Sequence, residues 1–165
     1  MSIWWSLHLR REAASVPLAR RLLLGTMETA GVDPDICFDL SIALSEACAN
    51  AVEHGGHTGH GDDSRGAYRV TAYLDGEKCR IEVTDSGPGF PANSASPAVP
   101  EAPEVSRRPV PVAAVPYDAE SGRGLSLIEE LADHVTIGNK PGRGGAVVSF
   151  DKILKWQKDA PLMAV

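Results

Sequence analysis

The chain has 165 residues, 43% of them hydrophobic and 23% charged, and its formal net charge is −6. This length suits one domain, residues 1–165, and is too short for two domains of ordinary size. The acidic balance without a Lys and Arg cluster argues against direct nucleic-acid binding, and no apolar run approaches the roughly 18 residues that a membrane span needs.

Strand and helix patterns follow one another in the first part of the chain. Apolar and polar residues alternate over 2–10, which predicts a half-buried strand. A helix is expected over 15–30, because a proline lies near its first turn and Gly31 follows its end. A second helix begins at Asp33-Pro34 and ends at Gly55-Gly56.

The rest of the chain divides at a proline-rich segment. Two strands, 67–74 and 78–85, are joined by Asp75-Gly76, a strong hairpin signal. Residues 91–121 hold seven of the twelve prolines and have no sustained period, so we expect a lid. The remaining elements expected are a helix over 125–134 and a strand over 145–152. This order predicts an α+β fold, a two-layer sandwich with helices covering one face of the sheet.

The second helix carries the most informative pattern. Glu46 and Asn50 are four residues apart, so they project from one face of the helix, in a pattern that suits a magnesium nucleotide. A surface acid paired with a neighbour is the alternative for Glu46 alone. A buried stripe runs along the same helix with the 3.6-residue period: Ile36, Leu40, Ala43, Leu44, Ala47 and Ala51. The chemistry is therefore expected beside the core.

Two glycine motifs follow. Asp85 ends the apolar row of its strand and begins Asp85-Ser86-Gly87-Pro88-Gly89, where a buried acceptor and close backbone approach could hold a base and sugar. Ser121-Gly122-Arg123-Gly124-Leu125 opens the next helix, and its amides could form an anion site. Taken singly, the first motif could be a turn and the second a hinge.

In this order the motifs resemble those of the GHKL (Bergerat) ATP-binding superfamily, and within it the anti-sigma factor serine kinases of bacteria. The resemblance implies a mixed, mostly antiparallel sheet and binding of ATP and Mg²⁺. Its implied site comprises Glu46 as general base, Asn50 as magnesium ligand, His54 beside the pocket, Asp85 on the adenine amino group, Gly87 and Gly89 shaping the pocket, and Gly122, Arg123, Gly124 and Leu125 at the phosphates.

The sequence departs from the family pattern at the last strand. That strand usually begins with Gly-Thr, whose hydroxyl supports the adenine-binding Asp, but this chain has Gly144-Gly145-Ala146. Ser149 or a bound water are the candidate substitutes. The lid of 31 residues is also longer and richer in proline than that of compact family members.

The resemblance implies an anti-sigma regulatory factor with serine kinase activity, which binds a sigma factor and phosphorylates a small antagonist protein. The alternatives are a nucleotide-binding interaction module without phosphotransfer and a stand-alone histidine kinase-type ATPase domain. Related proteins commonly dimerise, so a homodimer stays open.

The cysteines and three of the histidines are also considered as functional groups. The three cysteines have no C-x-x-C spacing, which favours reduced core thiols and a cytoplasmic protein. His54, His57 and His60 could ligate a metal, but a solvated glycine-rich loop is favoured, because ordering such a loop costs entropy and no cysteine completes a zinc set.

Overall fold

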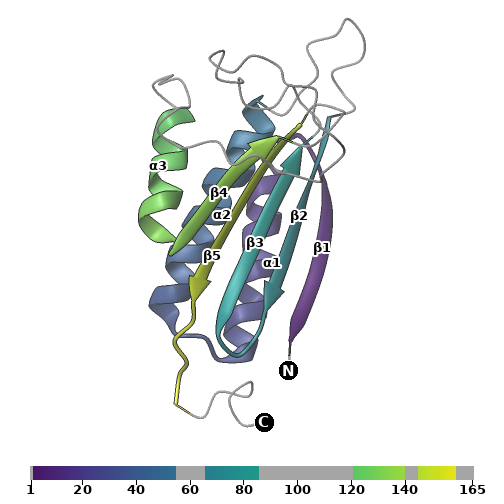
Figure 1. Ribbon diagram of the computed structural model, residues 1–165. Coiled ribbons are helices and arrows are strands. Elements are labelled where there is room, and N and C mark those ends of the chain that lie inside the picture. Colours follow the sequence, from purple (N-terminus) through teal and green to yellow (C-terminus); the bar gives the residue numbers. More distant parts are fainter. Residues whose placement is uncertain (1, 55–65, 86–120, 140–144, 159–165) are drawn as a thin grey trace, which may run out of the picture.

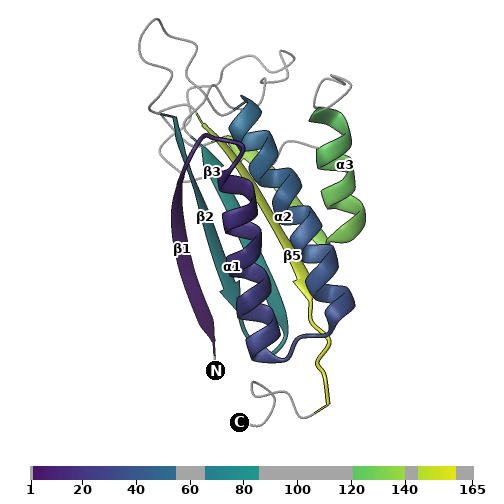
Figure 2. The same cartoon turned by 180° about the vertical axis from the view of Figure 1, so that it is seen from behind.

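The computed structural model describes residues 2–54, 66–85, 121–139 and 145–158. Within them the elements follow in the order β1 (Ile3–Arg10), α1 (Ser15–Ala30), α2 (Pro34–His54), β2 (Ala67–Leu74), β3 (Lys78–Asp85), α3 (Ser121–Leu131), β4 (His134–Asn139) and β5 (Ala146–Ile153). The strands form one sheet in the order β1-β2-β3-β5-β4, and each of these pairings is antiparallel. All three helices lie against the same face of the sheet (Figures 1 and 2). The predicted α+β sandwich is confirmed.

The sequence-based prediction was wrong at the end of α3. It extended this helix to residue 134 and missed β4 altogether, whereas the helix ends at Leu131 and a strand begins at His134. Val135 fits the helical period of the preceding residues, but it faces Phe150 across the β4–β5 ladder. Because the Val135-Thr136-Ile137 run is β-branched, it also fits a pleated sheet, and the pairing with β5 decides between the two.

The turn between α1 and α2 follows from local chemistry. Gly31 adopts a left-handed conformation with φ 88°, and its N–H donates to the carbonyl of Met27 at 3.0 Å. The N–H of Val32 donates to the same carbonyl, so two bonds close the end of α1. Oδ1 of Asp33 then accepts the N–H of Asp35 at 2.9 Å and caps the start of α2.

The core lies between the sheet and the helices. Phe150, Ile81 and Tyr68 are among its largest fully buried side chains. The stripe predicted on α2 is buried at every position: Ile36, Leu40, Ala43, Leu44, Ala47 and Ala51. Helix α2 is thus held by the core along its length, and the polar residues of its motif are carried on a fixed support.

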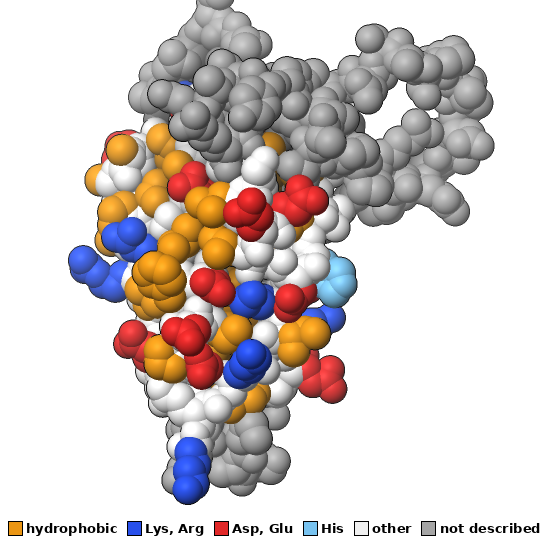
Figure 3. Space-filling view, turned by 90° about the vertical axis from the view of Figure 1, so that its left-hand side faces the viewer, with side chains coloured by type: hydrophobic (Ala, Val, Ile, Leu, Met, Phe, Trp, Pro, Cys, Tyr) orange, Lys and Arg blue, Asp and Glu red, His pale blue; other side chains and the backbone are white. Residues whose placement is uncertain are grey.

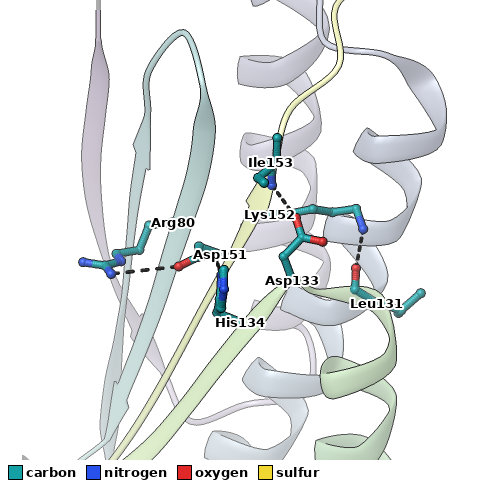
Figure 4. A network of polar contacts seen from close by, with 7 residues as sticks. All are labelled: Arg80, Leu131, Asp133, His134, Asp151, Lys152 and Ile153. Carbon is teal, nitrogen blue, oxygen red and sulfur yellow. Dashed lines mark hydrogen bonds and ion pairs between the residues drawn. The ribbon is translucent and has the colours of Figure 1, made fainter.

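A polar network ties the C-terminal end of α3 to the sheet (Figure 4). Nζ of Lys152 donates to the carbonyl of Leu131 at 2.6 Å and lies 3.8 Å from a carboxylate oxygen of Asp39 on α2. Oδ2 of Asp133 accepts the N–H of Ile153 at 2.6 Å. Lys152 therefore links α2, α3 and β5 at one point, and it satisfies a carbonyl that the helix itself leaves unpaired.

On the side of the molecule that α3 occupies, acidic, basic and hydrophobic side chains are interleaved over the described surface (Figure 3). Arg20 and Arg21 of α1 are exposed. None of the described helices is long and apolar enough to cross a membrane.

Candidate functional site

The predicted site residues come from three elements. Helix α2 carries Glu46 and Asn50, both of them half-buried, and β3 ends at Asp85, which is buried. The third element, α3, has Gly124 and Leu125 in its first two turns. Leu125 is buried in the core, so its contribution to a ligand would come from the backbone.

Several predicted residues can be located only in part. His54 is the last residue of α2, and Gly122 and Arg123 belong to the first turn of α3, but their side chains lie outside the described part of the chain. Gly87 and Gly89 lie outside it entirely, as do residues 91–120 of the predicted lid and the other two histidines of the glycine-rich loop, whereas the last residue of that lid, Ser121, begins α3. Their roles stay predictions.

Glu46 lies directly against the first turn of α3. A Cβ built on Gly124 would stand only 3.0 Å from Oε2 of Glu46 and 3.9 Å from its Cβ. The N-terminal turn of a helix has unpaired N–H groups and a partial positive charge, so it attracts anions such as phosphate. The structure thus brings a carboxylate of α2 next to a potential phosphate-binding helix end.

Asp85 is fixed by the backbone of the last strand. Its side chain faces the core like those of Cys79, Ile81 and Val83, and its Oδ1 accepts the N–H of Ala146 at 3.0 Å. This bond gives the buried carboxylate a partner, as burial of a charge requires.

The Ala146 amide is a main-chain donor to Asp85 at the position where the family has the threonine of Gly-Thr. The prediction that Ser149 replaces the threonine hydroxyl is wrong, because Ser149 pairs with Glu82 on the opposite face of the sheet from Asp85. This main-chain donor does not depend on the side chain at position 146, so alanine supplies it as well as threonine does. A main-chain donor leaves no side-chain signature, so the sequence alone could not reveal it.

A buried polar chain that the sequence analysis missed connects α2 with the Asp85 region. Tyr68 pairs with Asp85 across the β2–β3 ladder, and its hydroxyl lies 2.5 Å from Oγ of Ser15. Ser15 donates its own proton to the carbonyl of Glu12, so Tyr68 is the donor to Ser15. The Cys48 thiol, which lies between the two polar motif positions of α2, is next to the Tyr68 hydroxyl.

These groups are neutral structural elements. Burial raises the pKa of the Cys48 thiol to about 12 and that of the Tyr68 hydroxyl to about 12, so both keep their protons at neutral pH. Cys37 and Cys79 are likewise free and buried, which confirms the prediction of reduced core thiols. The network joins strand and helix beneath the site without adding charge there.

Arg11 holds the C-terminal end of α2, a second feature that the sequence did not reveal. Its Nε donates to the carbonyl of Val52 at 2.7 Å, and its backbone N–H donates to the carbonyl of Gly66. A guanidinium at this end of a helix satisfies an unpaired carbonyl and opposes the partial negative charge. The last turns of α2, which follow Asn50, are thereby fixed to the residue after β1.

The oxygen donors fit a magnesium nucleotide better than a metal bound by protein alone. Among the described residues there is no group of three or more His, Cys, Asp or Glu that could hold a metal ion. Magnesium in nucleotide sites usually takes only one or two protein oxygens and completes its shell with phosphates and water. The amide of Asn50 and the carboxylate of Glu46 offer such oxygens on one face of α2.

Comparison with known proteins places the chain in a family. A family profile described as "Histidine kinase-like ATPase domain" matches residues 9–152. The chain belongs to the histidine kinase-like ATPase family. It is 31% identical to a serine-protein kinase RsbW of Bacillus pumilus, over 87% of this chain and 81% of that protein. It is 29% identical to a serine-protein kinase RsbW of Staphylococcus aureus, over 87% and 82% respectively.

A solved structure supports the fold of this family member. The crystal structure of the RsbU and RsbW domains of Rv1364c from Mycobacterium tuberculosis matches 92% of this chain with a TM-score of 0.58 and 23% identity. The match covers 33% of that longer chain. Family membership implies that the protein uses ATP, as the motifs on α2, β3 and α3 predict.

Proposed function

We propose that this protein is a magnesium- and ATP-dependent serine kinase that phosphorylates a small antagonist protein and binds a sigma factor. The kinase class rests on relatives named serine-protein kinases, which are 28–31% identical over most of the chain. One structural observation carries the proposal: the Glu46 carboxylate lies against the first turn of α3, where phosphate would bind. The partners come from the family resemblance.

Each polar group of the site has a distinct proposed role. The buried Asp85 would accept a hydrogen bond from the adenine amino group while Ala146 holds one of its oxygens. Asn50 would give magnesium an amide oxygen, and the N–H groups that begin α3 would bind phosphate. ATP would supply the phosphoryl group and leave as ADP, with magnesium neutralising negative charge.

Glu46 would act as the general base. A serine hydroxyl must lose its proton as its oxygen bonds to the γ-phosphorus, and a carboxylate within reach can take that proton. Glu46 fits this role because it is half-buried, so the serine of a partner could reach it, and because it sits beside the phosphate end of the site. Asn50 and Asp85 carry the binding, which leaves Glu46 available for the proton.

The test is to incubate the purified protein with magnesium ATP and its cognate antagonist and to identify the phosphorylated residue. Acid-stable phosphoserine on the antagonist is the expected product. Acid-labile phosphate would instead indicate a histidine kinase-type ATPase acting on a separate protein. ATP binding without any transfer would overturn the kinase assignment in favour of a nucleotide-dependent interaction module.

A further inference from the structure

A glycine in the first turns of α3 touches the end of the Glu46 side chain that would do the chemistry. At Gly124 the nearest atom to an added Cβ would be Oε2 of Glu46, at 3.0 Å. Contacts this close are rare for real Cβ atoms, so an alanine would make its neighbour give way by a few tenths of an ångström. The backbone at Gly124 is helical, so its φ does not require glycine.

We propose that Gly124 is a positioning residue. Because it has no side chain, the Glu46 carboxylate can lie against the first turn of α3, and that turn determines the position of the carboxylate. The inference deepens the proposed function and rests on it for the consequence for catalysis. It differs from the phosphate-cradling role that the family resemblance implies for this glycine. In that role the residue would contact the ligand, whereas in the structure the atom nearest to an added Cβ is Oε2 of Glu46.

The surroundings decide which group would move if Gly124 gained a methyl group. Helix α3 is anchored by Leu125 and Ile128, both fully buried, and α2 by Ala47, which is also buried. Such packed helices shift little, because a dense core resists displacement. The Glu46 side chain is flexible and only half-buried, so the carboxylate is the part that yields.

Gly124→Ala should therefore separate stability from activity. Alanine favours a helix over glycine, while a misplacement of about 1 Å can cost a reaction roughly 100-fold. We expect transfer to slow about tenfold under saturating ATP, with ATP affinity unchanged and no loss of thermal stability. If ATP affinity falls instead and the rate at saturation is kept, Gly124 cradles phosphate and the proposal is wrong.

Gly25→Ala is the matched control. Gly25 lies inside α1, it is exposed, and a Cβ built there would meet no atom within 4 Å. We expect this variant to raise Tm by about 2–4 °C and to leave phosphotransfer unchanged. A loss of activity in both variants would show that helix rigidity, and not the position of the Glu46 carboxylate, is responsible.

A stability measurement tests the contact even if the protein transfers no phosphate. Glu46→Ala removes the carboxylate that an alanine at position 124 would meet, so the two positions should be coupled. Gly124→Ala should raise Tm by about 2–4 °C in the Glu46→Ala background and by less in the wild type. Equal Tm shifts in both backgrounds would refute the proposed contact between position 124 and Glu46. Different Tm shifts in the two backgrounds without any phosphotransfer would contradict only the proposed function.

Discussion

Replacement of Asp85 by asparagine should weaken ATP binding while the fold survives. The carboxylate accepts the N–H of Ala146 at 3.0 Å in a buried setting. The amide oxygen of asparagine can keep that bond, so we expect to lose only the extra strength of a charged acceptor, about 1 kcal/mol, or about 2–4 °C in Tm. Toward adenine, however, the amide would present an N–H₂ group to another donor.

The expected effect on binding is larger. Loss of a hydrogen bond to a charged acceptor costs about 1.5–3 kcal/mol, so Kd for ATP should rise roughly 10- to 150-fold. Isothermal titration calorimetry with magnesium ATP measures this directly, beside thermal unfolding of the same samples. Inosine triphosphate gives a second readout, since its exocyclic 6-oxo oxygen accepts where the 6-amino group of adenine donates, and the preference for ATP over it should shrink in Asp85→Asn.

Glu82→Gln provides the control for this experiment. It neutralises a carboxylate on the same strand, but on the opposite face of the sheet, so ATP affinity should not change. If Asp85→Asn binds ATP as tightly as the wild type, Asp85 is not the adenine acceptor. An equal loss of ATP affinity in both variants would show that the change in net charge causes the effect, and it would also refute the role of Asp85.

Two further predictions concern stability. Hydrogen bonds from the backbone N–H groups of Lys78 and its neighbour lower the pKa of Asp75, so this carboxylate should stabilise the fold above its unfolded pKa and lose that effect as pH falls through the folded value. Denaturant titrations should show Asp75→Asn less stable than wild type at pH 7, with a difference that shrinks as pH falls below the unfolded pKa of about 4, and a difference that does not shrink would refute this. Lys152→Met should lower the free energy of unfolding by about 1–3 kcal/mol, because it deprives the carbonyl of Leu131 of its donor. The exposed Lys155→Met is its control, and equal losses in the two variants would rule out the specific bond.

Local signals predicted the features that depend on neighbouring residues. The period of apolar positions located the buried stripe of α2, and Asp75-Gly76 located the hairpin between β2 and β3. The alternation along β3 also predicted that Asp85 would face the core, and the structure confirms it. In each case the predictive pattern lies within a few residues of the sequence.

Features that depend on distant segments escaped prediction. β4 was missed because Val135 satisfies both the helical and the strand period, and only its pairing with β5 selects the strand. The bond from the N–H of Ala146 to Asp85 was missed because the two residues are 61 positions apart. The contact between Gly124 and Glu46 depends on how α2 and α3 pack, which no single motif specifies.

The central claim is that Glu46 serves the chemistry and leaves binding to other residues. The most direct measurement pairs ATP affinity with the rate of phosphoserine formation in Glu46→Gln. We predict a loss of roughly 10²- to 10⁴-fold in rate with ATP affinity unchanged, and wild-type values for the exposed control Glu129→Gln on α3. Phosphoserine formation at the wild-type rate in Glu46→Gln would contradict the claim.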